Sequence, residues 1–150
     1  MITGESDKKI KQLSLFLENT SGRLVDALSL LGDARINIRA LSLSDTSDFG
    51  ILRLIVNDVD KAYQILTDKH YTVLKSDVVA VEVEDRPGAL VDILRILKDA
   101  EINVEYTYAF VERGGEQAIL IFRFDDVEKG IRVLQGKGVT LLTADQVRTR

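Results

Sequence analysis

The chain has 150 residues, 45% of them apolar, and a formal net charge of −4. This size and apolar content suit one or two small domains with real cores, and the mild acidity gives no overall attraction to nucleic acid or to an anionic membrane. The chain has no cysteine, which excludes disulfides, thiol chemistry and Cys-based metal sites and fits a reducing, cytoplasmic environment.

The first nine residues are polar and carry both signs of charge. They lack the apolar stretch of a signal peptide, and no apolar run in the chain approaches the length of a membrane span. We interpret residues 1–9 as a leader or a cloning remnant and leave them out of the predicted fold.

An internal repeat organises the rest of the chain. When the sequence is displaced by 66 residues, Gly22 meets Gly88 and Ile36-Asn37-Ile38 meets Ile102-Asn103-Val104. After a two-residue insertion near Gly114-Gly115 the displacement becomes 68, and Asn57-Asp58 meets Asp125-Asp126. Matches that stay in register indicate two copies of one structural unit. We place the copies at residues 10–76 and 77–143, with a C-terminal tail at 144–150.

Each copy shows the same order of predicted elements. In the first copy, alternating or apolar-rich strands are expected at 10–17, 36–44, 50–56 and 72–75, and amphipathic helices at 22–33 and from the N-cap Asp58 to about 68. In the second copy the strands are at 78–83, 102–112, 118–124 and 139–142, and the helices at 88–99 and from Asp126 to about 136. The order βαββαβ is that of the ferredoxin-like unit. We therefore predict an α+β protein of two such units, each an antiparallel four-stranded sheet with its helices on one face.

The two faces of the predicted sheets differ in composition. The helix-facing positions are Leu13, Leu15, Leu17, Leu52, Leu54 and Val56 in the first copy, and Val79, Val81, Val83, Leu120, Phe122 and Phe124 in the second. The opposite face mixes Phe16, Ile51, Ile55, Ile119 and Ile121 with polar residues. A fully solvated face would be more polar, so we expect it to be partly covered, by the other copy or by a second chain, although scattered surface apolar residues are common.

Several functions found on this topology need residues that this sequence does not have. The strands at 51–56 and 119–124 have no basic–aromatic pattern for stacking RNA bases, and metal chaperones would need cysteines. Acylphosphatase-like catalysis would need a glycine-rich phosphate loop, which is missing although Arg23 is present. We expect no catalytic residues, no metal or cofactor, and no nucleic-acid or membrane partner.

The turn after the first strand carries the most specific motif. It reads Glu18-Asn19-Thr20-Ser21-Gly22-Arg23-Leu24 in the first copy and Glu84-Asp85-Arg86-Pro87-Gly88-Ala89-Leu90 in the second. An asparagine follows each glycine by fifteen residues. Asp-Arg-Pro-Gly-Ala-Leu, followed by Ala-x-Ile-Asn-Val, resembles the ACT domain family over roughly residues 10–142. Two departures are the serine at position 21, where the family usually has proline, and Arg35 and Glu101, where a helix-capping glycine is usual.

The turn has the chemistry of a site for an amino acid. A helix N-terminus has unpaired N–H groups and a positive dipole that suit a carboxylate, glycine permits close approach, and an asparagine amide can meet an ammonium or a carboxylate. The resemblance implies an effector held between this loop and the second strand of a neighbouring domain. It nominates Asn19, Thr20, Ser21, Gly22, Arg23, Leu24 and Asn37 in the first copy, and Asp85, Arg86, Pro87, Gly88 and Asn103 in the second.

Structural roles compete with these assignments. Asn19 and Asp85 suit turns or caps, Asn37 and Asn103 could bond a neighbouring backbone group, and both glycines could serve the turn alone. Asp45 and Thr46 lie in a hairpin similar to one that lines the effector site of aspartokinase regulatory domains, but a plain turn explains them too. We interpret the aromatic stripe Tyr106, Tyr108 and Phe110 as packing and His70 as a surface helix cap.

The sequence thus favours a regulator over an enzyme. We expect a stand-alone tandem ACT protein that binds a small amino acid and modulates a partner, such as an enzyme of amino-acid metabolism, and that forms a homo-oligomer, most simply a dimer. The alternative is an oligomerisation or interaction module that binds no ligand, and a small enzyme with an undetected site is a third hypothesis.

Overall fold

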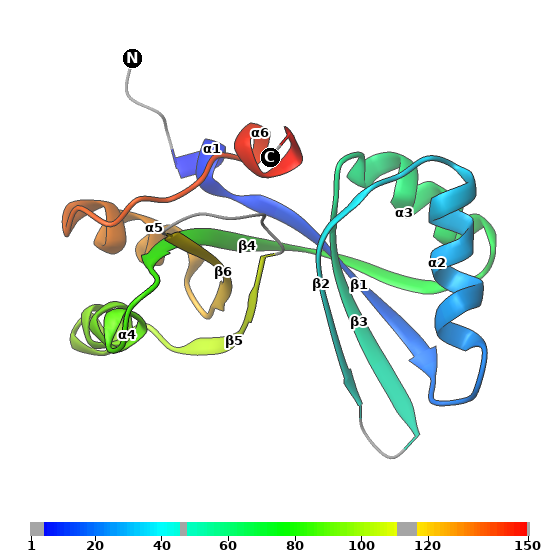
Figure 1. Ribbon diagram of the computed structural model, residues 1–150, viewed down its shortest axis with the longest axis horizontal. Coiled ribbons are helices and arrows are strands. Elements are labelled where there is room, and N and C mark those ends of the chain that lie inside the picture. Colours follow the sequence, from blue (N-terminus) through cyan, green and yellow to red (C-terminus); the bar gives the residue numbers. More distant parts are fainter. Residues whose placement is uncertain (1–4, 46–47, 111–116, 150) are drawn as a thin grey trace. The chain divides into compact units, whose positions relative to one another are not determined.

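The structure is a computed structural model that describes residues 5–45, 48–110 and 117–149 (Figure 1). Its strands are β1 (Ile10–Glu18), β2 (Ile38–Asp45), β3 (Phe49–Val56), β4 (Thr72–Glu84), β5 (Val104–Ala109) and β6 (Gln117–Phe124). Its helices are α1 (Glu5–Lys8), α2 (Arg23–Asp33), α3 (Val59–Asp68), α4 (Ala89–Asp99), α5 (Val127–Gly136) and α6 (Ala144–Thr149). The predicted α+β class is confirmed.

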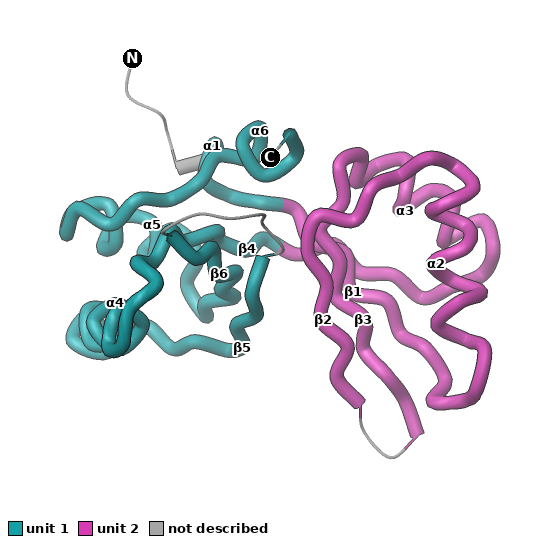
Figure 2. Tube along the Cα trace, in the orientation of Figure 1, with its two compact units in different colours: residues 1–10, 77–150 teal, residues 11–76 magenta. Residues whose placement is uncertain are grey.

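The chain divides into two structural units, coloured separately in Figure 2. Residues 11–76 form the first-repeat unit, and residues 1–10 with 77–150 form the second-repeat unit. The hydrogen-bonded strand order is β2-β3-β1-β4-β6-β5, and β1 with β3, β2 with β3, β4 with β6 and β5 with β6 all pair antiparallel. The long strand β4 contributes to both units because the boundary falls after Ser76.

The expected count of four strands per copy needs correction. The strand predicted at 72–75 continues without interruption into the one predicted at 78–83, and together they form β4. The strand predicted at 139–142 is reduced to one bridge between Val81 and Leu141, with flanking bonds from Glu82 N–H to the Thr140 carbonyl and from Leu142 N–H to the Ala80 carbonyl. Sequence alternation cannot show that two successive predicted strands form one continuous strand.

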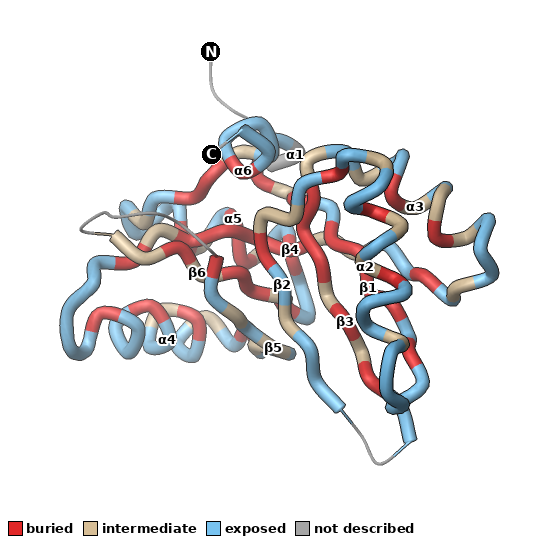
Figure 3. Tube along the Cα trace, turned by 45° about the vertical axis from the view of Figure 1, so that its right-hand side comes forward, coloured by how far each residue is buried: buried red, intermediate tan, exposed pale blue. Residues whose placement is uncertain are grey.

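Each unit has its own apolar core between sheet and helices, and Figure 3 shows how burial alternates along the strands. All six helix-facing residues predicted for the first copy are buried in its core. In the second copy five of the six are buried, and Leu120 packs against the core while partly buried. Within the other face, Ile55, Ile119 and Ile121 are buried, as expected for a covered surface, whereas Phe16 is 36% exposed.

Both ends of the chain contribute ordered helices to the second-repeat unit. α1 contacts α5, and the buried Lys8 donates a hydrogen bond from Nζ to the Leu141 carbonyl at 3.1 Å. α6 begins with a capping box, because Gln146 N–H donates to Thr143 Oγ1 at 3.1 Å and Thr143 N–H donates to Gln146 Oε1 at 2.8 Å. Residues 5–8, left outside the predicted fold, therefore pack on the second repeat, and most of the segment described as a tail is helical.

The ends of α2 and α4 explain one departure from the family pattern, the missing glycine at positions 35 and 101. Arg35 and Glu101 have φ of 59° and 58°, the left-handed conformation that the usual glycine would adopt. Each is followed by a bond that closes the helix end, from Ile36 N–H to the Leu31 carbonyl and from Ile102 N–H to the Leu97 carbonyl, both at 2.9 Å. The cap geometry is therefore retained at the cost of backbone strain.

Candidate functional site

The loop between β1 and α2 is an exposed tight turn. Asn19, Thr20 and Ser21 are all exposed, and the turn is closed by bonds from Thr20 N–H to the Glu18 carbonyl at 2.8 Å and from Arg23 N–H to the Thr20 carbonyl at 3.3 Å. Gly22 takes φ of 90°, which L-residues with a side chain rarely adopt. The backbone conformation at position 22 therefore requires glycine.

The corresponding loop of the second repeat has the same backbone. Arg86 N–H donates to the Glu84 carbonyl at 2.9 Å, Ala89 N–H donates to the Arg86 carbonyl at 3.2 Å, and Gly88 has φ of 86°. Asp85, Arg86 and Pro87 are exposed. The exchange of Ser21 for Pro87 thus leaves the loop conformation unchanged.

The helices that follow these loops begin without a side-chain cap. Gly22 and Gly88 are the N-cap residues of α2 and α4, and neither N-terminus has a side-chain cap bond. By contrast α3 and α5 are capped as predicted, because Asp58 accepts from Lys61 N–H at 3.2 Å and Asp126 accepts from Lys129 N–H at 3.1 Å. The first turns of α2 and α4 therefore present backbone donors to whatever lies outside them.

The hairpin between β2 and β3 meets the first of these loops. Asn19 N–H donates to the Asp48 carbonyl at 3.1 Å, and Asp45, at the end of β2, is exposed. Thr46 lies outside the described residues. The structure therefore brings the loop around Asn19 together with the hairpin that carries Asp45.

Asn37 lies at the opposite end of the same sheet. Glu18 pairs with Phe49 where β1 ends, whereas Ile38, next to Asn37, pairs with Val56 at the far end of β3. β2 thus runs the length of the sheet between Asn37 and Asp45. Within one unit Asn37 does not join the loop, and the same strand order separates Asn103 from Gly88.

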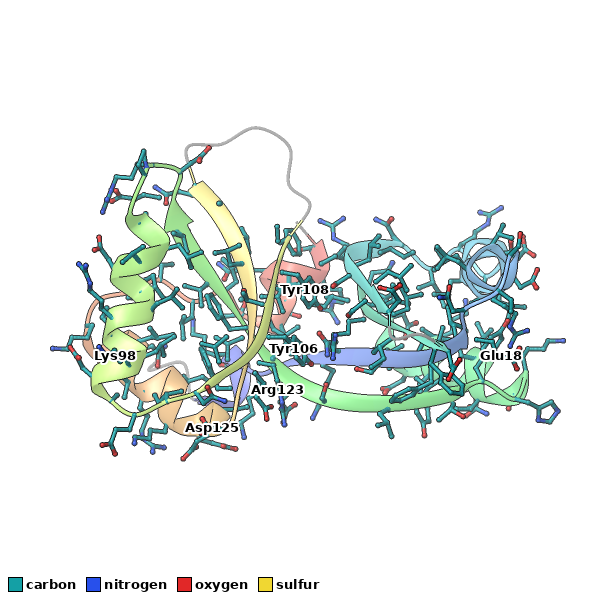
Figure 4. The ribbon with its side chains drawn as sticks, turned by 90° about the horizontal axis from the view of Figure 1, so that it is seen from below. Glu18, Lys98, Tyr106, Tyr108, Arg123 and Asp125 are labelled. Atoms are coloured by element: carbon teal, nitrogen blue, oxygen red, sulfur yellow. The ribbon has the colours of Figure 1, made fainter. Side chains whose placement is uncertain are left out.

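Each of these asparagines is fixed through its backbone by a residue that the sequence analysis did not single out. Asn37 N–H donates to Asn57 Oδ1 at 2.9 Å, and Asn103 N–H donates to Asp125 Oδ1 at 3.0 Å (Asp125 is labelled in Figure 4). In the described residues the side-chain amides of Asn37 and Asn103 make no hydrogen bond and are exposed. The repeat alignment of Asn57 with Asp125 was the signal for this role.

The second-repeat loop carries an ion-pair cluster. Arg86 donates from Nε to Glu84 at 2.6 Å and from Nη2 to Asp92 at 3.1 Å. The hydrogen bond that Arg86 donates to Glu84, followed by the one it donates to Asp92, raises the pKa of the Arg86 guanidinium. In the first repeat position 20 is a threonine, so this cluster has no counterpart there.

Two hollows lie beside the starts of these helices. In the second-repeat unit, a cavity of about 300 Å³ is lined by Glu82, Val83, Glu84, Arg86, Ala89, Asp92, Ile93, Gln117, Gly138, Val139 and Thr140. In the first-repeat unit, an apolar surface hollow on α2 is lined by Gly22, Leu24, Val25, Leu28 and Ser29. Leu24 and Val25, which are neighbours in this hollow, are 37% and 61% exposed.

The remaining residues considered from the sequence are three aromatic residues at and after β5 and the single histidine. Tyr106 and Tyr108 stack on β5 with ring centroids 6.5 Å apart (Figure 4), and Phe110 is buried. His70 is exposed, with φ of 68° after the end of α3. Among the described residues no group of His, Asp and Glu side chains is arranged to hold a metal ion, and none of the described helices is long and apolar enough to cross a membrane.

Comparison with known proteins identifies the repeat. The family model of the ACT domain pair matches residues 8–149. The chain belongs to the ACT domain family. ACT domains are regulatory domains, so the chain is a tandem ACT regulatory pair whose two ferredoxin-like units are the two ACT domains.

Solved structures are similar to this chain in fold. Protein BT0572 from Bacteroides thetaiotaomicron is 40% identical, with a TM-score of 0.89 over 95% of this chain and 98% of that one. The ligand-free regulatory subunit of aspartate kinase from Thermus thermophilus is 13% identical, with a TM-score of 0.63 over 91% of this chain and 98% of that one. The latter likeness shows the fold alone. A search of curated protein sequences found no significant match.

Proposed function

We propose that this ACT pair binds a small amino acid at the loop between β1 and α2 and so modulates a partner, such as an enzyme of amino-acid metabolism. The observation that carries the proposal is the uncapped start of α2 behind Gly22, with exposed Asn19 beside it. The backbone donors suit the carboxylate of a zwitterion, and amide side chains suit its ammonium group. The aspartate kinase subunits with this fold are regulatory by name, which supports the same assignment.

A second chain completes the proposed site. Asn37 is exposed with an unused amide, yet it lies at the far end of β2 from the loop of its own unit. Asn37 can therefore contact a ligand only if the site is formed against another domain. A homodimer that brings the start of β2 from one chain to the Gly22 loop of the other meets this requirement.

The first repeat is the better carboxylate site of the two. Its loop, Asn19-Thr20-Ser21, carries no charge, whereas the second loop carries Asp85. A ligand carboxylate is repelled by a carboxylate at close range. We therefore assign the tighter site to the first-repeat loop.

The test is a thermal-unfolding screen of the twenty amino acids. A ligand at about 100 times its dissociation constant stabilises a protein by about 2.7 kcal/mol, which for a chain of this size is a rise in Tm of several degrees. A rise with one amino acid or a related group supports the proposal, and no change at millimolar concentrations with any of them rejects it.

One observation favours the alternative, an interaction module without a ligand. The exposed apolar residues of α2 recur on α4, where Leu90, Val91 and Leu94 are 36%, 46% and 37% exposed. Such repeated exposure is typical of contact surfaces. Under this alternative, Leu24→Ser with Val25→Ser changes the oligomeric state or partner binding while no amino acid shifts the Tm.

A further inference from the structure

The second repeat holds a guanidinium between two carboxylates beside the start of α4. Arg86 donates from Nε to Glu84 at 2.6 Å and from Nη2 to Asp92 at 3.1 Å. Glu84 is the last residue of β4, and Asp92 lies in the first turn of α4. A carboxylate at the end of this strand and one in the first turn of the next helix are therefore close enough to bind the same guanidinium.

The first repeat has both carboxylates but lacks the arginine. At the displacement of 66 residues the corresponding pairs are Glu18 with Glu84, Thr20 with Arg86, and Asp26 with Asp92. Glu18 is the last residue of β1 (labelled in Figure 4), and Asp26 lies in the first turn of α2. Both side chains are exposed, and neither forms an ion pair or a hydrogen bond with a described residue. Their charge is therefore not neutralised within the described part of the chain.

The backbone that positions these carboxylates is the same in both repeats. The bond from Thr20 N–H to the Glu18 carbonyl is 2.8 Å long, and its counterpart in the second repeat is 2.9 Å. The bond from Asp26 N–H to the Gly22 carbonyl is 3.0 Å long, and its counterpart is 3.1 Å. Because the anchoring bonds match, the side chains of Glu18 and Asp26 can reach one cation as their counterparts do.

The nearest arginine along α2 is held away from this pair. Arg23 precedes Asp26 by three residues, a spacing at which helical side chains of opposite charge can meet. Instead, its guanidinium carbon lies 5.5 Å from the ring centroid of Tyr71, its Nε is buried, and it makes no ion pair with a described residue. The cation–π contact with Tyr71 thus leaves the two carboxylates open to a cation from outside the chain.

We propose that Glu18 and Asp26 bind the guanidinium of a ligand in the place that Arg86 takes in the second repeat, so that the effector of the first-repeat site is free arginine. This inference rests on the amino-acid site proposed at the Gly22 loop and names its ligand. The planar N–H donors of a guanidinium can be shared by two carboxylates. The N–H groups of Leu24 and Val25, second and third in α2, have no hydrogen-bond partner among the described residues and suit the α-carboxylate.

The first test compares L-arginine with L-citrulline by calorimetry on the full chain. Citrulline has the same shape but carries an uncharged urea group in place of the guanidinium. We expect arginine to bind at least about tenfold more tightly, since its hydrogen bonds to the carboxylates are charge-assisted. Binding of other amino acids without a preference for arginine overturns this inference and leaves the proposed function standing, whereas no binding by any amino acid rejects both.

Four variants locate the guanidinium. Thr20→Arg supplies an internal guanidinium, as in the second repeat, and should abolish arginine binding. Glu18→Gln and Asp26→Asn each remove one carboxylate and should weaken binding at least about fivefold, which tests the site if Thr20→Arg fails to fold. Asp33→Asn makes the same change at the other end of α2 and should bind arginine as the wild type does. Undiminished arginine binding in a folded Thr20→Arg protein, or in both carboxylate variants, would overturn the proposal.

Discussion

Asn57 and Asn37 are joined by two hydrogen bonds that fix the start of β2. Asn57 Oδ1 accepts from Asn37 N–H at 2.9 Å, and Asn57 N–H donates to the Asn37 carbonyl at 3.1 Å. The second repeat has the same pair of bonds between Asp125 and Asn103. Each pair orients the exposed asparagine from which a ligand contact is proposed.

Removing the Oδ1 acceptor of Asn57 or Asp125 should destabilise the start of the strand that it holds. We expect Asn57→Ala and Asp125→Ala each to lower the free energy of unfolding by about 1 kcal/mol, since one net hydrogen bond is lost. Asn57→Asp and Asp125→Asn keep an acceptor oxygen and are the matched controls. Urea unfolding of the four variants checks this, and an alanine variant as stable as its control would contradict it.

Strained helix ends should improve with glycine. Arg35 and Glu101 hold left-handed φ, and so does His70, whose counterpart in the second repeat is Gly138. A left-handed residue with a side chain costs about 1–2 kcal/mol, partly offset by the greater freedom of unfolded glycine. Glycine at each position should therefore raise the free energy of unfolding by about 0.5–1 kcal/mol. The reciprocal control is Gly138→Ala, which should lower it; stabilisation there would count against the explanation.

Gly130 should tolerate no side chain. It is buried within α5, and a Cβ there would lie 2.7 Å from Cε2 of the buried Phe124. Overpacking of this kind costs about 1–3 kcal/mol, more than the gain in helix propensity from Gly to Ala of about 1 kcal/mol. Gly136→Ala, in the same helix with nothing near the new Cβ, is the control and should not destabilise. Thermal unfolding that ranks Gly130→Ala at or above the wild type would refute this contact.

Acid should weaken one tie between the N-terminal segment and α5. Lys9 Nζ lies 2.5 Å from Glu128 Oε1, and this hydrogen bond is the main reason that the pKa of Glu128 lies below its usual value of 4.5. Because the folded-state pKa is lowered, the stabilisation is present at neutral pH and is lost as the pH falls through the folded-state value. Lys9→Met should move the pKa of Glu128 upward in an NMR titration. An unmoved pKa would show that the ion pair is not formed in solution.

The sequence predicted most of the architecture because the repeat and the hydrophobic periods are local. Asp58 and Asp126 cap their helices, and the glycines of both loops have positive φ. The continuity of β4 and the packing of Lys8 on Leu141 were missed because they depend on backbone direction and on contacts between residues far apart in the chain.

For the candidate site, the sequence predicted the turn conformation of the two loops but not where the asparagines lie relative to them. That Asn37 lies away from Gly22 follows from strand order, which a motif does not encode. The exchange of Arg23 and Tyr71 for Ala89 and Val139 is visible in the repeat alignment, but only the structure shows that Arg23 lies over the Tyr71 ring.

The most direct test of the proposed function is calorimetry of the stabilising amino acid with wild type, Asn37→Ala and Asn103→Ala. We predict that Asn37→Ala weakens binding by about 1–3 kcal/mol, because a charged ligand group loses its partner, while unfolding without ligand changes less. Asn103→Ala should bind the amino acid with an affinity closer to that of the wild type. Unchanged affinity in Asn37→Ala with loss only in Asn103→Ala would contradict the account and move the site to the second repeat.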